Sequence, residues 1–163
     1  MIFLAVGTFG FERLVIKMDE IAARFDEEVI MQIGETKYIP QNAKYFDFCS
    51  EQDLKEFCRK ASVVVTHGGV GLILDALGEG KPLVVVPRLR KCGEVIDDHQ
   101  LYLVQELEKQ SKLTAIYDVD KLEAGLRKIS LKPLELVKDK RLVNALRAYI
   151  VRLEQRKQKP NRD

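Results

Sequence analysis

Cysteine is scarce in this sequence, and long hydrophobic runs are missing. The 163 residues include three cysteines, Cys49, Cys58 and Cys92, an odd number with no C-x-x-C spacing. We therefore expect free thiols in a reducing compartment and no metal site. No stretch approaches the roughly 20 apolar residues that cross a bilayer, and residues 1–7 lack the basic start of a signal peptide. These absences favour a cytoplasmic location, with any membrane contact peripheral and through a partner.

An excess of charge of one sign is also missing. The formal net charge is +2, which gives no global field for binding nucleic acid, so we do not expect that partner. Hydrophobic residues make up 46% of the chain and charged residues 32%, as in a soluble globular protein. The length and the lack of a linker predict one domain over residues 1–157, with a disordered tail at 158–163.

Strand-like and helix-like patterns alternate along the whole chain. Apolar runs predict strands at residues 2–6, 28–33, 44–48, 63–66, 83–86 and 113–117, the last at a sheet edge. Helical spacing predicts helices at 11–22, 51–60, 97–109, 119–129 and 138–157, and a further helix opens at the glycines after residue 67. The alternation predicts an α/β fold, a doubly wound parallel sheet of the Rossmann-like kind.

Residues 61–78 carry the strongest functional pattern. A buried-type strand runs into Gly68, Gly69 and Gly71, which open an apolar helix whose segment contains two ionisable side chains, His67 and Asp75. Backbone N–H groups at a helix start attract phosphate, and a nearby carboxylate can accept from a pair of sugar hydroxyls. The pattern therefore predicts a nucleotide site. Alternatives remain open. The glycines also suit tight turns, Asp75 also suits an exposed or salt-bridged position, and His67 also suits a structural role.

Two further segments are candidates for function. The loop of residues 7–10 follows the first strand and has the composition to present backbone N–H groups to the same diphosphate. The apolar stripe and basic face of residues 138–157 suit packing on the chain's own sheet and docking to a partner or an anionic membrane equally. A dinucleotide fingerprint is not complete, because residues 69–74 carry two of its three glycines.

The central segment resembles a known family. Residues 66–77 followed by residues 80–87 are similar to the donor-binding signature of family 28 glycosyltransferases, as are residues 98–100 and the opening at residues 6–9. The length corresponds to a single C-terminal-type half of a GT-B enzyme. The chain thus resembles the small soluble subunit of split UDP-sugar transferases, of the dolichol N-acetylglucosaminyltransferase and exopolysaccharide types.

The resemblance implies a set of donor-binding residues. Asp75 occupies the place of a ribose-binding glutamate that is one methylene longer, and Leu72 stands where a serine or threonine commonly helps bind phosphate. The resemblance implies uracil contacts from Phe48, Cys49 and Ser50, diphosphate contacts from His67, Gly68, Gly69 and Gly71 with Gly7 and Thr8 facing them, and sugar contacts from His99 and Gln100. It also implies an inverting reaction with no metal and no cofactor beyond the UDP-sugar donor.

The same resemblance implies a membrane-anchored partner subunit that binds a lipid-linked acceptor. We expect transfer of a hexose or N-acetylhexosamine to that acceptor. The acceptor hydroxyl needs a general base. His67 is the candidate catalytic residue of this chain, but its place beside the donor favours a base from the partner, and we expect the chain alone to be inactive or nearly so. The alternative is a non-catalytic interaction subunit that activates a separate glycosyltransferase.

Overall fold

The computed structural model describes residues 1–96 and 99–130, which form one six-stranded sheet with helices on both faces. Its order is β3-β2-β1-β4-β5-β6, and all neighbouring strands are parallel. This is the order of a Rossmann-like doubly wound sheet, so the predicted fold class is confirmed. The strands are β1 (Ile2–Ala5), β2 (Val29–Gln32), β3 (Lys44–Phe46), β4 (Val63–Thr66), β5 (Leu83–Val85) and β6 (Thr114–Ala115).

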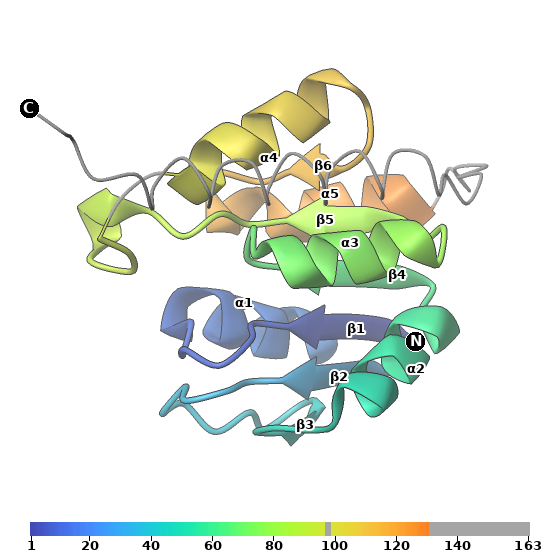
Figure 1. Cartoon of the computed structure of the whole chain (residues 1–163). Helices are drawn as coiled ribbons and strands as arrows, with labels where there is room; N and C mark the ends of the chain where they lie inside the picture. Colours follow the sequence, from blue (N-terminus) through green and yellow to red (C-terminus); the bar gives the residue numbers. More distant parts are fainter. Residues whose placement is uncertain (97–98, 131–163) are drawn as a thin grey trace, which may run out of the picture.

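Helices cover the two faces of the sheet unequally, as Figure 1 shows: α1 and α5 lie on one face and α2, α3 and α4 on the other. Successive side chains of a strand point to opposite faces, so Ile2 and Leu4 pack with α1 and α5, whereas Phe3 packs with the other three. The helices are α1 (Glu12–Ala22), α2 (Glu51–Lys60), α3 (Val70–Gly78), α4 (His99–Lys109) and α5 (Leu122–Ser130), with short 3-10 turns η1 (Arg90–Cys92) and η2 (Val119–Lys121).

The C-terminal half differs in detail from the prediction. The expected helix at 119–129 begins as η2, because the Asp118 carboxylate accepts from the N–H of Asp120 at 3.2 Å and holds a tighter first turn. The expected edge strand at 113–117 is at the edge, but β6 pairs only with Val84 and Val85 of β5 and is two residues long. The predicted helix at 138–157 and tail at 158–163 lie outside the described residues.

All three cysteines are free thiols in the structure, as expected. Within residues 1–96 and 99–130, none of the helices has the length and apolar character needed to cross a membrane.

Candidate functional site

The two predicted glycine loops meet at the carboxyl edge of the sheet, between β1 and β4. The chain leaves β1 toward α1 on one face and β4 toward α3 on the other (Figure 1). Ala5 and Thr66 are register partners, so the residues that follow them emerge side by side. Doubly wound sheets bind ligands where the strand order reverses in this way. The fold therefore brings both loops that the sequence singled out to one place.

His67 lies beneath the turn that joins β4 to α3. A Cβ at Gly69 would come within 2.4 Å of His67 Nε2, and a Cβ at Gly7 within 3.2 Å of its Cε1. The imidazole is therefore wedged between the two glycine loops, and it is 8% exposed. Burial, with a smaller effect from the charge of Arg88, lowers the pKa of His67 to about 4. The ring is uncharged at neutral pH.

Helix α3 begins without a capping side chain. Its N-cap residue is Gly69, and no acidic residue lies in its first turn. The first N–H groups of a helix have no partner within the helix, so here they can donate to a ligand. Gly71 is exposed, and a Cβ there would meet nothing within 4 Å. This arrangement suits an anion, because the helix dipole adds to the open N–H groups.

Gly7 and Thr8 differ in what they can offer a ligand. Gly7 has a left-handed backbone with φ of +75°, which favours glycine. Its N–H donates to Gln32 Oε1 and its carbonyl accepts from Gln32 Nε2, both at 2.9 Å. Thr8, in contrast, is exposed. Gly7 therefore shapes the loop, and Thr8 is the better placed of the two for the predicted diphosphate contact.

Gln32 is a positioning residue that sequence reasoning missed. It is 4% exposed at the end of β2, and its Nε2 also donates to the carbonyl of Asp47 at 2.7 Å. One amide side chain therefore joins the first glycine loop to the segment that leads into Phe48. A signal was present, because a glutamine inside the apolar run of residues 29–33 must find partners when buried.

Helices α2 and α3 pack together, and the charge of Asp75 on α3 acts on a thiol of α2. Burial is the largest cause that raises the pKa of the Cys58 thiol to about 12, and the charge of Asp75 is the next. Cys58 is a fully buried residue of α2, so the carboxylate is close to that helix. The charge of Cys49 also raises the pKa of the Cys58 thiol. The charges of the half-buried Asp75 and of the predicted uracil segment thus act on the same thiol.

The segment of Phe48, Cys49 and Ser50 is exposed, and Phe48 alone has 59% of its surface open to solvent. The hydroxyl and the carbonyl of Ser50 both accept from N–H groups of α2, at 3.1 Å from Asp53 and 3.0 Å from Leu54. Backbone recognition of a base by this segment would therefore depend on the Ser50 N–H and on the backbone of Phe48 and Cys49.

Gln100, in the first turn of α4, lies against the turn after β4. A Cβ at Gly68 would be 3.5 Å from Gln100 Cβ and 3.7 Å from its Oε1. That Oε1 atom is buried and finds no donor among residues 1–96 and 99–130, so it is an acceptor in need of a partner. His99 opens α4, but its side chain lies outside the described residues, and its sugar contact stays a prediction.

The loop after β5 is anchored to α1 by an ion pair that the sequence did not reveal. Arg13 Nε lies 2.8 Å from Glu94 Oε1 and Arg13 Nη2 lies 2.9 Å from Glu94 Oε2. Arg88 belongs to the same loop, and its side chain is buried against the first glycine loop. As for metals, the described part of the chain brings no three His, Cys, Asp or Glu side chains together around one ion.

Known proteins resemble this chain in sequence. The family model for the glycosyltransferase family 28 C-terminal domain matches residues 1–153. The human UDP-N-acetylglucosamine transferase subunit ALG13 is 31% identical over 123 residues, which are 69% of this chain and 10% of that protein. The subunit of the same name from Eremothecium gossypii is 29% identical over 126 residues, 76% of this chain and 60% of that protein. The chain thus spans less than two thirds of the length of these relatives.

Solved structures share the fold. The solution structure of ALG13 aligns with a TM-score of 0.61 at 20% identity, over 89% of this chain and 93% of that one. The glycosyltransferase SsfS6 from Streptomyces sp. SF2575, complexed with thymidine diphosphate, aligns with a TM-score of 0.63 at 23% identity, over 95% of this chain and 40% of that one. Together with the family match along most of the sequence, they lead to one conclusion: this chain belongs to the glycosyltransferase family 28 C-terminal domain family.

Proposed function

We propose that this chain is the donor-binding subunit of a UDP-sugar transferase. It binds the UDP-sugar and, with a membrane-anchored partner subunit, transfers a hexose or N-acetylhexosamine to a lipid-linked acceptor. The observation that carries the proposal is the uncapped start of α3 at the reversal of strand order, in a chain of this family. The relatives are named as subunits of UDP-N-acetylglucosamine transferases, which favours that donor and supports the need for a partner.

The diphosphate would lie at the start of α3. The open N–H groups there and the helix dipole stabilise the negative charge that grows on the leaving group, and they need no reorganisation during the reaction. Gly71 keeps a side chain out of this space, and Gly69 leaves room for the His67 ring beneath it. The same fixed dipoles would take the role that a divalent cation has in other transferases, so we expect activity to persist in excess EDTA.

Ribose and uracil would lie on the α2 side of this position. Asp75 would accept hydrogen bonds from the ribose hydroxyls, and the backbone of Phe48, Cys49 and Ser50 would meet the base. The buried and unpaired Gln100 Oε1 beside Gly68 would accept from a hydroxyl of the donor sugar. Transfer with inversion requires the acceptor to attack from the sugar face opposite the diphosphate, which leaves that face to the partner subunit.

The general base is best supplied by the partner. The His67 pKa of about 4 and the burial of its ring make it a weak base for an acceptor hydroxyl. His67 instead supports the two glycine loops that would hold the diphosphate. We therefore expect the purified chain to bind UDP but to transfer sugar slowly or not at all without its partner.

Titration with UDP tests the proposal. Hydrogen exchange should slow at residues 66–75 on binding, and Asp75→Ala should weaken UDP binding by about 1–3 kcal/mol through the loss of charge-assisted hydrogen bonds. Asp26→Ala removes the same charge from an exposed position in the loop before β2 and serves as the matched control. Normal UDP binding by Asp75→Ala would show that the ribose assignment is wrong. Absence of UDP binding, alone and with the partner, would favour the non-catalytic interaction subunit.

A further inference from the structure

Arg88 is a buried cation next to the candidate site, and the proposed function has not used it. Its side chain is 4% exposed. Its Nη2 atom donates to the carbonyl of Phe9 at 2.6 Å and to that of Val6 at 3.0 Å, with a longer contact of 3.4 Å to Gly10. All three acceptors belong to the end of β1 and the first glycine loop. One side chain from the loop after β5 therefore holds that glycine loop in shape.

Among residues 1–96 and 99–130, no carboxylate forms an ion pair with Arg88. The charge of Glu94 acts on Arg88, but the Glu94 oxygens pair with Arg13 and accept from the N–H of Leu89. In the part of the chain that the structure describes, Arg88 forms no ion pair, and its Nε is buried without an acceptor. Its remaining contact is the ring of Phe11, whose centroid lies 5.1 Å from Cζ. Burying an unpaired charge costs free energy, so an anion nearby would be favourable.

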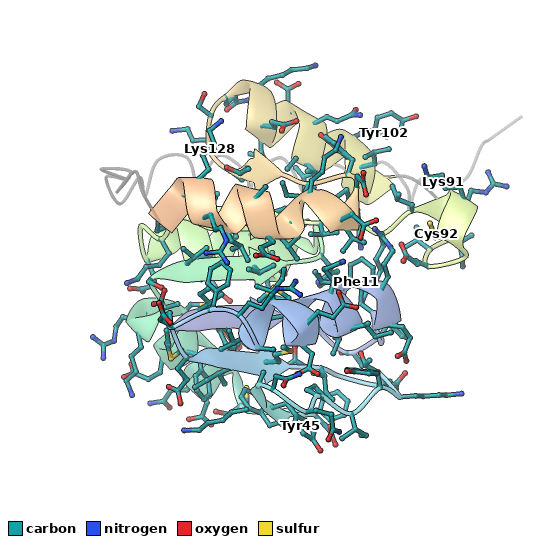
Figure 2. The ribbon with its side chains drawn as sticks, turned by 180° about the vertical axis from the view of Figure 1, so that it is seen from behind. Phe11, Tyr45, Lys91, Cys92, Tyr102 and Lys128 are labelled. Carbon is teal, nitrogen blue, oxygen red and sulfur yellow. The ribbon has the colours of Figure 1, made fainter. Side chains whose placement is uncertain are left out.

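The cation also lies close to the second glycine loop. Its charge reaches His67, whose ring separates Gly7 from Gly69. Figure 2 shows Phe11 in the interior of the molecule, in contrast to Lys91, which lies on the turn that projects from it. Arg88 is thus buried against the first glycine loop, where its guanidinium donates to the carbonyls of Val6 and Phe9. In this poorly solvated setting its charge is weakly screened.

We propose that Arg88 is a positioning residue for a diphosphate. Its N–H donors fix the first glycine loop, and its unpaired charge favours an anion between that loop and the start of α3. The inference rests on the proposed function and adds to it a residue that does not touch the donor. If Arg88 acts through its charge, loss of that charge weakens the binding of UDP but not that of uridine, which carries no phosphate. A purely structural role would affect both ligands alike.

The test compares UDP and uridine binding in Arg88→Gln and in the matched control Lys91→Gln, which removes the same charge from an exposed position. Arg88→Gln should weaken UDP binding on the order of tenfold and uridine binding by less than about twofold, as expected for a lost charge interaction. Lys91→Gln should change neither. Equal losses for the two ligands, or no loss for UDP, would overturn the inference and leave the proposed function in place.

Arg88→Lys separates the two parts of the proposal and also serves if circular dichroism shows that Arg88→Gln does not fold. Lysine keeps the charge but carries it on a compact ammonium group, which lacks the planar fork of N–H donors of arginine. The ratio of UDP to uridine affinity should stay as in the unaltered chain, while hydrogen exchange of residues 7–10 without ligand becomes faster. Unchanged exchange, or a lost preference for UDP, would overturn the inference. Failure of the unaltered chain to bind UDP, alone and with its partner, would overturn the proposed function and this inference with it.

Discussion

Helices α2 and α3 lie on the same face of the sheet but begin in opposite ways. Helix α2 starts at Ser50, whose hydroxyl accepts from the N–H of Asp53, and its first turn holds the acidic Glu51 and Asp53. Helix α3 starts at Gly69, with no capping side chain and no acidic residue in its first turn. The protein thus satisfies the start of α2 by itself and leaves the start of α3 for a ligand.

Packing explains why the two helix starts differ. Every side chain that caps a helix carries a Cβ, and at position 69 that atom would lie 2.4 Å from the buried ring of His67. Ser50 is exposed and has room for its side chain. The open start of α3 is therefore required by the imidazole beneath it, and the absence of a cap follows from contacts in the core.

Gly69→Ala should give the largest effect. Its methyl group would displace the His67 ring, which we expect to cost about 3 kcal/mol of folding free energy, as in an overpacked core, and to abolish detectable UDP binding. Chemical denaturation and calorimetric titration measure the two effects. Gly78→Ala, in the last turn of the same helix, is the control, since its Cβ would meet nothing within 4 Å. An unaltered stability for Gly69→Ala would contradict the packing argument.

The pH dependence of stability tests the ring itself. Burial first, and then Arg88, lower the pKa of His67 from 6.5 to about 4, so the unfolded chain takes up a proton before the folded one does. The contribution of the neutral His67 ring to the free energy of unfolding is therefore complete above about pH 6.5. It is lost as the pH falls toward 4, and the loss is on the order of 2 kcal/mol by pH 5. His67→Asn removes the titrating group and should flatten this part of the profile. An NMR titration that finds His67 charged at pH 6 would rule out the buried neutral ring.

Ser50→Ala removes the cap of α2. Loss of a capping hydroxyl should lower the free energy of unfolding by about 1 kcal/mol. Since the predicted uracil contacts of this segment use backbone groups, UDP binding should fall less than in Asp75→Ala. Denaturation with urea and titration with UDP would measure both. A larger loss of UDP binding than in Asp75→Ala would instead indicate that the Ser50 hydroxyl itself contacts the base.

Gly71→Ala should have the smallest effect on the fold. The added methyl group meets no atom of the protein within 4 Å, and alanine favours the helix, so stability should rise by up to about 0.5 kcal/mol. UDP binding should nevertheless weaken, because the methyl group would enter the space proposed for the diphosphate. Thermal denaturation and UDP titration would separate the two effects. Unchanged UDP affinity would place the diphosphate elsewhere.

Much of the fold could be predicted because it depends on local patterns. The apolar runs of Val63–Thr66 and Leu83–Val85 are buried strands, and α2 has the bounds of the helix expected at 51–60. The switch from η2 to α5 was missed, because it depends on how Asp118 folds back on its own turn. The contacts of His99 and the helix at 138–157 stay predictions.

The two glycine loops of the site were predicted from the sequence, but the buried side chains that hold the first loop in place were not. Gln32 and the Gly7 N–H that it holds are 25 residues apart, and Arg88 and the Phe9 carbonyl are 79 apart. No periodicity links residues at such separations, so the hydrogen bonds that shape the first glycine loop could not be read from the sequence.

The sequence by itself determined the alternation of strands and helices, the glycines at the ends of β1 and β4, and the family. Local propensity and side-chain periodicity are sufficient for the strands, helices and glycine turns, and the family follows from the similarity of the sequence to other members. Only the tertiary structure decided that His67 is buried and neutral, that position 69 has no room for a cap, and that Arg88 is buried against the first glycine loop with no ion pair among the described residues. Burial and charge pairing are properties of segments far apart in the chain, and folding alone brings those segments into contact.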